Sequence, residues 1–148
     1  MARVLLTGMS GTGKSTVLGA LGRRGHLVLD TDDEGWVLGD ATWDEPRMRT
    51  FLEAHRRVVV SGTVENQGVL YPSFEHVVLL SAPLPVLLER LRRRTTNPYG
   101  KTEQHRAEVA RYLEQVEPLL RRGATVELDA RQPIQVLTDA VELLLAST

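Results

Sequence analysis

The amino-acid sequence predicts an α/β fold with three layers, in which one parallel sheet of five strands has helices on both faces. Short apolar runs alternate along the chain with longer segments of helical spacing, as in successive β-α-β units. These short runs are almost continuously apolar, which is typical of strands buried on both faces. No repeat, linker or low-complexity tract interrupts the 148 residues, so we expect residues 1–148 to form a single domain.

The expected strands are the runs at 3–7, 26–29, 57–62, 76–81 and 124–129. The centre of the third run is Val58-Val59-Val60, and three successive β-branched residues favour a strand. A glycine-rich loop follows the first run, and an acidic loop follows the second. Because ligands bind at the carboxyl ends of the strands in open parallel sheets, we expect both loops at one functional edge.

The expected helices are one that ends near residue 24 and others at 44–57, 86–94, 102–122 and 134–145. Gly25, directly after basic residues, is a stop signal for the first helix, while Asp44 and Pro46 suit the cap and first turn of the second. Pro118 predicts a kink or a restart in the long fourth helix. The stretch before the fourth strand contains Pro72 and is expected to be irregular.

The loop after the first strand carries the most specific motif in the chain. Gly8, Gly13, Lys14 and Ser15 have the spacing G-x-x-x-x-G-K-S/T of a P-loop, between an expected strand and an expected helix. Glycines allow several N–H groups to face one anion, and the helix dipole adds positive potential. Lys14 would bridge the β- and γ-phosphates, and the Ser15 hydroxyl would bind Mg²⁺. The alternative is a glycine-rich turn without a ligand.

This motif predicts that the chain binds a nucleoside triphosphate together with Mg²⁺. The loop residues expected at the nucleotide are Gly8, Ser10, Gly11, Thr12, Gly13, Lys14, Ser15 and Thr16. Neither N-K-x-D nor T-K-x-D occurs, which disfavours a GTPase and makes ATP the expected donor.

Asp30 and Asp32 follow the second strand and are expected at the same edge as the P-loop. One would reach Mg²⁺ through water, and the other would accept a hydrogen bond or a proton from an acceptor hydroxyl. The alternative is a polar loop in which Asp33 caps a short helix. Many P-loop ATPases end the third strand with an aspartate, but here Ser61-Gly62-Thr63 stands there. That difference argues against a motor or a true AAA-type ATPase.

Further side chains near this edge have two interpretations each. The two tryptophans would either wall an acceptor pocket or pack in the core. Two arginines would either meet an acceptor anion or be solvated. The polar triplet after the third strand would either contact the acceptor or form an ordinary loop. These residues are Trp36 and Trp43, Arg47 and Arg49, and Glu65, Asn66 and Gln67.

A polar stretch at 95–102, interrupted by proline and glycine, is expected to form a short lid. Arg94 and Lys101 stand at its edges and would close over the transferred phosphate, excluding water. The basic turn before the lid would otherwise be a solvated helix end, where positive charge complements the helix dipole.

Over nearly its whole length the chain resembles the small P-loop kinases of the shikimate kinase, gluconate kinase and nucleoside monophosphate kinase group. The tripeptide 30–32 looks like the shikimate kinase motif, which implies that Asp30 supports Mg²⁺ and Asp32 touches the acceptor hydroxyl. The stretch 90–94 is similar to the R-x-x-x-R of adenylate kinase lids, which implies that Arg90 stacks on adenine and Arg94 binds the phosphates. The loop 129–133, which contains Arg131, would then flank the base. Residues 97–101 also resemble small uncharacterised AAA-type ATP-binding proteins.

The resemblance implies ATP-dependent phosphoryl transfer to a small-molecule acceptor. Lys14, Asp32 and Arg94 would be the catalytic residues, and Ser15 and Asp30 the metal-binding ones. Shikimate kinases carry three glycines after the third strand, whereas this chain keeps only Gly62, so the identity of the acceptor does not transfer. The alternatives are a nucleotide-binding switch or scaffold, and an ATP hydrolase with water as the acceptor.

Composition excludes several other classes of function. A net charge of −1 provides no basic surface for nucleic acid, and no apolar run reaches the length of a membrane span. The first residues lead straight into a strand and leave no room for a signal peptide, so we expect a cytoplasmic protein. There is no cysteine, and the four histidines have no metal-ligand spacing. Nothing in the sequence indicates an oligomeric state.

Overall fold

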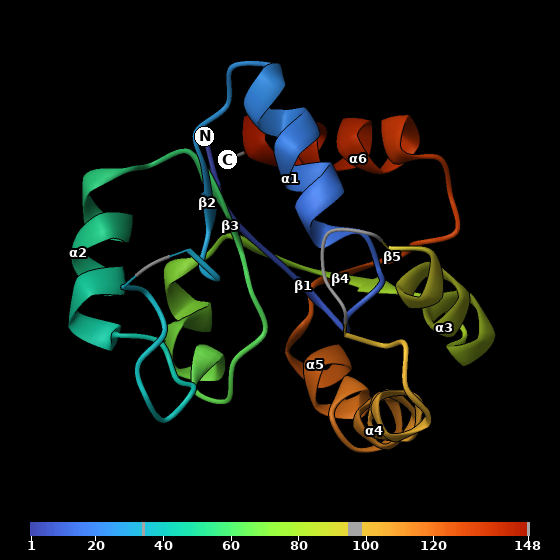
Figure 1. The fold of residues 1–148 in the computed structure, drawn as a ribbon. Helices are drawn as coiled ribbons and strands as arrows, with labels where there is room; N and C mark the ends of the chain where they lie inside the picture. Colours follow the sequence, from blue (N-terminus) through green and yellow to red (C-terminus); the bar gives the residue numbers. More distant parts are fainter. Residues whose placement is uncertain (34, 95–98, 148) are drawn as a thin grey trace.

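The computed structural model describes residues 1–33, 35–94 and 99–147 (Figure 1). Its five-stranded parallel sheet has the order β2-β3-β1-β4-β5. The strands are β1 (Arg3–Gly8), β2 (Val28–Asp30), β3 (Val58–Ser61), β4 (His76–Ser81) and β5 (Val126–Asp129). The predicted parallel α/β sheet is therefore confirmed, and β1 occupies its centre between β3 and β4.

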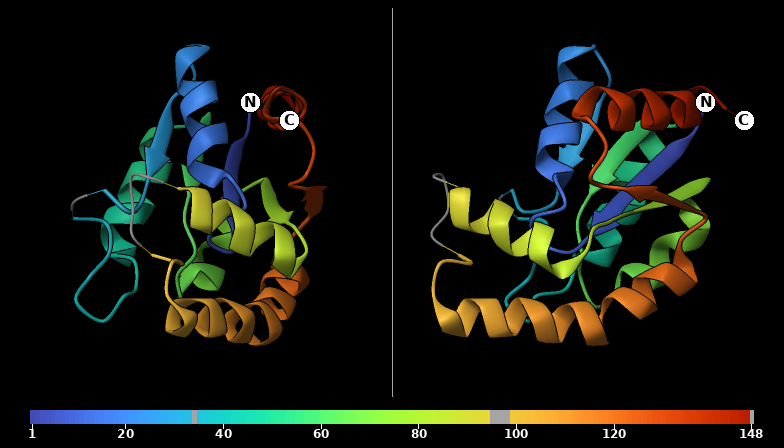
Figure 2. Two further views of the ribbon diagram at one scale, coloured as in Figure 1. Left: turned by 45° about the vertical axis from the view of Figure 1, so that its right-hand side comes forward. Right: turned by 90° about the vertical axis from the view of Figure 1, so that its right-hand side faces the viewer.

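Helices cover both faces of the sheet (Figures 1 and 2). They are α1 (Lys14–Arg23), α2 (Glu45–Ala54), α3 (Leu84–Arg93), α4 (Glu103–Gln115), α5 (Glu117–Gly123) and α6 (Ile134–Ala146), with a 3₁₀ helix η1 (Gln67–Ser73). The pair α1 and α6 packs on one face, while α2, η1 and α5 lie on the other. The three predicted layers are present.

The alternation of side chains along β1 explains these two layers of helices. Val4 and Leu6 pack with the apolar residues of α1 and α6, whereas Leu5 packs with those of α2 and η1. All three side chains are fully buried. Every residue of β3 is buried as well, as its continuous β-branched run predicted. The sheet edge that carries the P-loop is thus held by apolar packing on both sides.

Some predicted boundaries are wrong for identifiable reasons. The strand β2 begins at Val28 instead of residue 26, because the His26 N–H donates to the carbonyl oxygen of Leu21 at 3.1 Å and so belongs to the turn after α1. The helix α2 ends at Ala54 instead of residue 57, since His55 is already extended. There Arg3 Nε caps the helix end by donating to the carbonyl oxygen of Leu52 at 2.7 Å.

The predicted helix 102–122 consists of two helices, α4 and α5. Pro118 lies in the first turn of α5, where a missing N–H costs little, so the chain restarts before this proline. The stretch expected to be irregular is the 3₁₀ helix η1, which contains Pro72. Within the described part of the chain, no helix combines the length and apolar character that crossing a membrane requires.

Candidate active site

The P-loop lies between the end of β1 and the start of α1, at the middle of the sheet edge. Gly8 has φ 153°, and a Cβ there would stand 2.5 Å from the carbonyl oxygen of Leu80, so only glycine fits this close approach. Gly13, with φ 95°, precedes α1 and leaves its N-terminus without a side-chain cap. No acidic residue lies in the first turn of α1. The backbone N–H groups at this helix start are suited to an anion.

The side chains of the predicted nucleotide-binding loop divide into two groups. Ser10, Ser15 and Thr16 are exposed. Thr12 is fully buried, and its hydroxyl donates to the carbonyl oxygen of Met9 at 2.8 Å. The Thr12 side chain therefore fixes the loop from inside, so any contact of this residue with phosphate would come from its backbone.

Lys14 folds back over the P-loop. Its Nζ donates to the carbonyl oxygen of Gly8 at 2.5 Å and to that of Met9 at 3.2 Å. Burial lowers the pKa of Lys14 to about 8. The negative charges of Asp32 and Asp30 oppose this lowering, and the positive charge of Arg94 adds to it. Asp30 and Asp32 at the end of β2 and Arg94 at the end of α3 therefore lie near enough to Lys14 to act on its charge.

The lowered pKa of Lys14 predicts pH-dependent nucleotide affinity. Phosphate favours the charged amine, so MgATP binding should take up about one proton above pH 8, and affinity should fall by about tenfold per pH unit there. Calorimetry at pH 7 and pH 9, in buffers of different ionisation enthalpy, measures both effects. Lys14→Ala is the control, which should bind weakly and without proton uptake from this group. A wild-type affinity that is constant across this range would contradict the prediction.

Asp30 and Asp32 flank a residue that anchors their loop to β3. Thr31 is fully buried, and both its backbone N–H and its hydroxyl donate to the carbonyl oxygen of Ser61, at 3.0 and 2.8 Å. The Asp32 N–H donates to the Asp30 carboxylate at 3.0 Å. Partial desolvation raises the pKa of Asp32, as does the charge of Asp30, while Lys14 opposes the rise. A carboxylate of raised pKa beside the P-loop is suited to accept a proton.

The tryptophans pack in the core. Trp43 is 1% exposed and Trp36 is 9% exposed, and both belong to the apolar cluster on the α2 face. Trp43 and the Thr31 hydroxyl occupy the space in which a side chain at Gly62 would stand. The Arg47 guanidinium lies over the Trp36 ring at 4.0 Å from its centroid. Of the two interpretations of the tryptophans, packing is the one that the structure supports.

The polar residues after β3 mainly support the scaffold. Asn66 accepts from the Trp43 N–H at 2.9 Å and donates to the Trp43 carbonyl oxygen at 3.1 Å, which fixes the loop before α2. Gln67 is 2% exposed and bonds within the protein. Glu65 and Arg49 are exposed. None of these contacts indicates an acceptor site.

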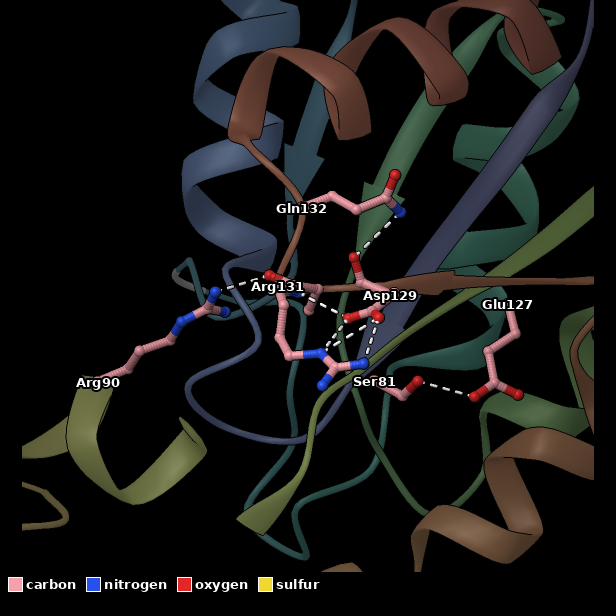
Figure 3. Close-up of polar contacts among 7 residues, drawn as sticks. Ser81, Arg90, Glu127, Asp129, Arg131 and Gln132 are labelled. Carbon is pink, nitrogen blue, oxygen red and sulfur yellow. Dashed lines mark hydrogen bonds and ion pairs between the residues drawn. The ribbon is translucent and has the colours of Figure 1, made fainter. Parts of the chain in front are cut away.

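Arg90 and Arg94 lie one helical turn apart at the end of α3. The Arg90 guanidinium donates to the carbonyl oxygen of Ala130 at 2.7 Å, in the loop after β5 (Figure 3). It also donates to the carbonyl oxygen of Gly11 at 3.3 Å, and thereby joins the P-loop to the loop after β5. Arg94 Nε is buried, and among the described residues it has no hydrogen-bond partner. Arg94 thus offers a buried donor beside Lys14, as a phosphate clamp requires.

The remaining basic candidates are engaged elsewhere. Arg131 is bidentate to Asp129, with Nη2 2.7 Å from Oδ2, and this pairing lowers the pKa of Asp129 to about 2 (Figure 3). Arg131 would have to leave Asp129 to contact a base. Lys101 is exposed and donates to the carbonyl oxygen of Arg92 at 2.7 Å, so it lies against the end of α3. Of the expected lid at 95–102, residues 95–98 lie outside the described part.

One residue close to the P-loop was missed by sequence reasoning. Thr63 follows β3 and donates its hydroxyl to the carbonyl oxygen of Gly8 at 2.7 Å. The signal in the sequence was the position of Thr63 at the end of the third strand, where many P-loop ATPases carry an aspartate.

The residues present are compatible with a magnesium ion held jointly with nucleotide phosphates. No group of three or more His, Asp or Glu side chains able to hold a metal occurs within residues 1–33, 35–94 and 99–147. Mg²⁺ in phosphoryl-transfer sites uses few protein ligands, together with phosphate oxygens and water. The exposed Ser15 hydroxyl at the start of α1 and the Asp30 carboxylate at the end of β2 are oxygen donors of the kind that such an ion takes.

Solved structures with a similar fold include small kinases. Shikimate kinase from Acinetobacter baumannii in complex with shikimate has a TM-score of 0.69 at 22% identity, covering 98% of this chain and 93% of that one. A gluconokinase from Sinorhizobium meliloti has a TM-score of 0.67 at 23% identity, covering 97% and 91%. These similarities establish a P-loop kinase fold, which confirms the resemblance seen in the sequence.

Sequence comparison adds a relative and a family. Dephospho-CoA kinase from Corynebacterium glutamicum is 27% identical over 117 residues, 76% of this chain and 57% of that protein. The chain spans somewhat more than half the length of the first curated relatives that it matches. The family described as AAA domain matches residues 4–111, a range that includes the P-loop, Asp30, Asp32, Arg90 and Arg94. The chain belongs to this AAA-domain family of P-loop proteins.

Proposed function

We propose that this protein transfers the γ-phosphoryl group of ATP, in the presence of Mg²⁺, to a small-molecule acceptor. The observation that carries the proposal is the grouping of Lys14, Asp30, Asp32 and Arg94 around the P-loop. Two cations beside the expected phosphates offset charge in the transition state, and two carboxylates serve the metal and the acceptor. Shikimate kinase, gluconokinase and dephospho-CoA kinase, by their names, act on small molecules, which supports the same class here.

Each residue then has one task. The P-loop N–H groups and Lys14 bind the phosphates, Arg94 approaches the transferred group, and Ser15 and Asp30 hold the ion directly or through water. Mg²⁺ supplies neutralisation of phosphate charge. The acceptor oxygen attacks the γ-phosphorus as the bond to the β–γ bridging oxygen breaks. ADP departs and the acceptor proton passes to Asp32.

On the nucleoside side, the loop after β5 would flank the base. Arg90 already contacts this loop through Ala130, and Arg131 lies on it. The base would therefore lie between the P-loop and residues 129–133, with the acceptor on the opposite side, near β2. This division keeps donor and acceptor on separate sides of the transferred phosphoryl group.

Measuring ATP consumption across a panel of small metabolites tests the proposal. We expect slow consumption with ATP and Mg²⁺ alone, and stimulation by one chemical class of acceptor, with one phosphorylated product formed per ADP. Slow consumption with every compound would favour a nucleotide switch or scaffold. Rapid consumption that yields free phosphate without any acceptor would favour ATP hydrolysis.

A further inference from the structure

A chain of side-chain hydrogen bonds runs beneath the P-loop, from η1 to Lys14. The Thr63 oxygen lies 2.7 Å from Gly8 O, 3.2 Å from Gly8 N and 3.0 Å from Thr7 Oγ1. Thr7 Oγ1 in turn accepts from Gln67 Nε2 at 3.2 Å, and Gln67 Nε2 also donates to the Tyr71 hydroxyl at 2.9 Å. The contacts of Thr63 and Gln67 with Thr7 and Gly8 join residues that are 55 to 60 positions apart in sequence.

The direction of each hydrogen bond between Gln67 and Gly8 in this chain is fixed. A carbonyl oxygen only accepts, so the Thr63 hydroxyl must donate to Gly8 O. Thr63 then accepts from the Gly8 N–H and from the Thr7 hydroxyl, and Thr7 accepts from Gln67. The Val64 N–H donates to Gln67 Oε1 at 2.9 Å, which sets the orientation of that amide. Thr7 is fully buried and Gln67 is 2% exposed, so water has little access to replace a lost partner.

Two donors share the carbonyl oxygen of Gly8. Lys14 Nζ approaches it at 2.5 Å and the Thr63 hydroxyl at 2.7 Å, which uses both lone pairs. Lys14 must leave this carbonyl to reach nucleotide phosphates. Gly8 is buried, and a buried carbonyl that loses its last donor is costly. Thr63 removes that cost, because its hydroxyl still satisfies Gly8 O after Lys14 has left.

We propose that Thr63 is a positioning residue of the nucleotide site, which holds the Gly8 peptide in place and thereby frees Lys14 for the phosphates. This inference rests on the proposed role of Lys14 in MgATP binding, and it does not depend on which acceptor is used. Many P-loop ATPases use an aspartate at the end of this strand to support the metal. In this chain the loop after β3 acts on the P-loop backbone instead.

A matched pair of variants tests the proposal by calorimetry with MgATP. Thr63→Val keeps the shape of the side chain but removes the hydroxyl, and we expect it to weaken MgATP binding by about tenfold. Thr63→Ser keeps the hydroxyl and should bind like the wild type. Thermal unfolding of both variants verifies that the fold is retained. Wild-type affinity in folded Thr63→Val would overturn the proposal without touching the proposed kinase activity.

A double-mutant cycle separates the release of Lys14 from a merely structural role. In a Lys14→Ala background there is no amine to release, so adding Thr63→Val should change the remaining MgATP affinity by less than about twofold. An unchanged tenfold loss in that background would overturn the role in freeing Lys14. Amide exchange of Gly8, followed by NMR in the free protein, should be faster in Thr63→Val and unchanged in Thr63→Ser. Equal protection in all three proteins would show that the Thr63–Gly8 contact does not form.

Discussion

Lys14→Ala is expected to lower acceptor-dependent turnover by about a hundredfold to a thousandfold, the usual cost of removing one preorganised donor from a transition state. Lys14 donates to the carbonyl oxygens of Gly8 and Met9, so its amine already lies at the loop that would hold the phosphates. The protein should remain folded, because burial disfavours the charge of Lys14 and Thr63 still satisfies Gly8 O.

Steady-state kinetics with the identified acceptor, together with circular dichroism, measures this loss. Arg49→Ala is a suitable control, since Arg49 is exposed on α2 and has no place in the proposed site. The control should keep wild-type turnover. Full turnover in a folded Lys14→Ala protein would refute the proposed mechanism, whichever acceptor is used.

Asp32→Asn should lower kcat by about a hundredfold or more while changing MgATP affinity little. The amide keeps the size of the side chain and its ability to hydrogen-bond, but it takes up no proton. The raised pKa of Asp32, which arises from partial desolvation and from Asp30, indicates a carboxylate that is readier than usual to accept a proton. The expected signature is therefore a loss in the chemical step, separate from binding.

The neighbouring Asp33→Asn provides the matched control, because it removes one exposed charge from the same loop, and that charge makes the smallest of the contributions to the pKa of Asp32. Calorimetry gives the MgATP affinity, and single-turnover kinetics gives the chemical step. Comparable losses of affinity and turnover in Asp32→Asn would assign Asp32 to the metal and would leave the acceptor without its proposed base.

Local patterns in the sequence were enough to locate most of the site. Gly8, Gly13 and Lys14 obey a spacing that the required backbone conformations impose, and the structure shows positive φ angles at both glycines. Asp30 and Asp32 were identified because they follow an apolar run in a chain of β-α-β units. The rule that strand ends share one edge then put them beside the P-loop. The electrostatic interactions of Lys14 with both aspartates agree with that placement.

The questions that the sequence left open share a different origin. Whether Trp43 lines a pocket or fills the core depends on what packs around it, and whether Gln67 meets an acceptor depends on a partner as distant as Thr7. Lys101, expected at the edge of the lid, donates to the carbonyl oxygen of Arg92 at the end of α3. In each case the residue type permits several partners, and local spacing contains no information that selects one of them.

By itself, the sequence determined the parallel α/β class, the phosphate loop and the residues that follow each strand, because hydrophobic periodicity and turn chemistry act over a few neighbouring residues. Only the tertiary structure decided the order β2-β3-β1-β4-β5, and with it the meeting of Thr63 with Gly8 across 55 residues. Strand order and register depend on pairings between distant segments. Such pairings are selected by the packing of both sheet faces together, which no single stretch of the chain specifies.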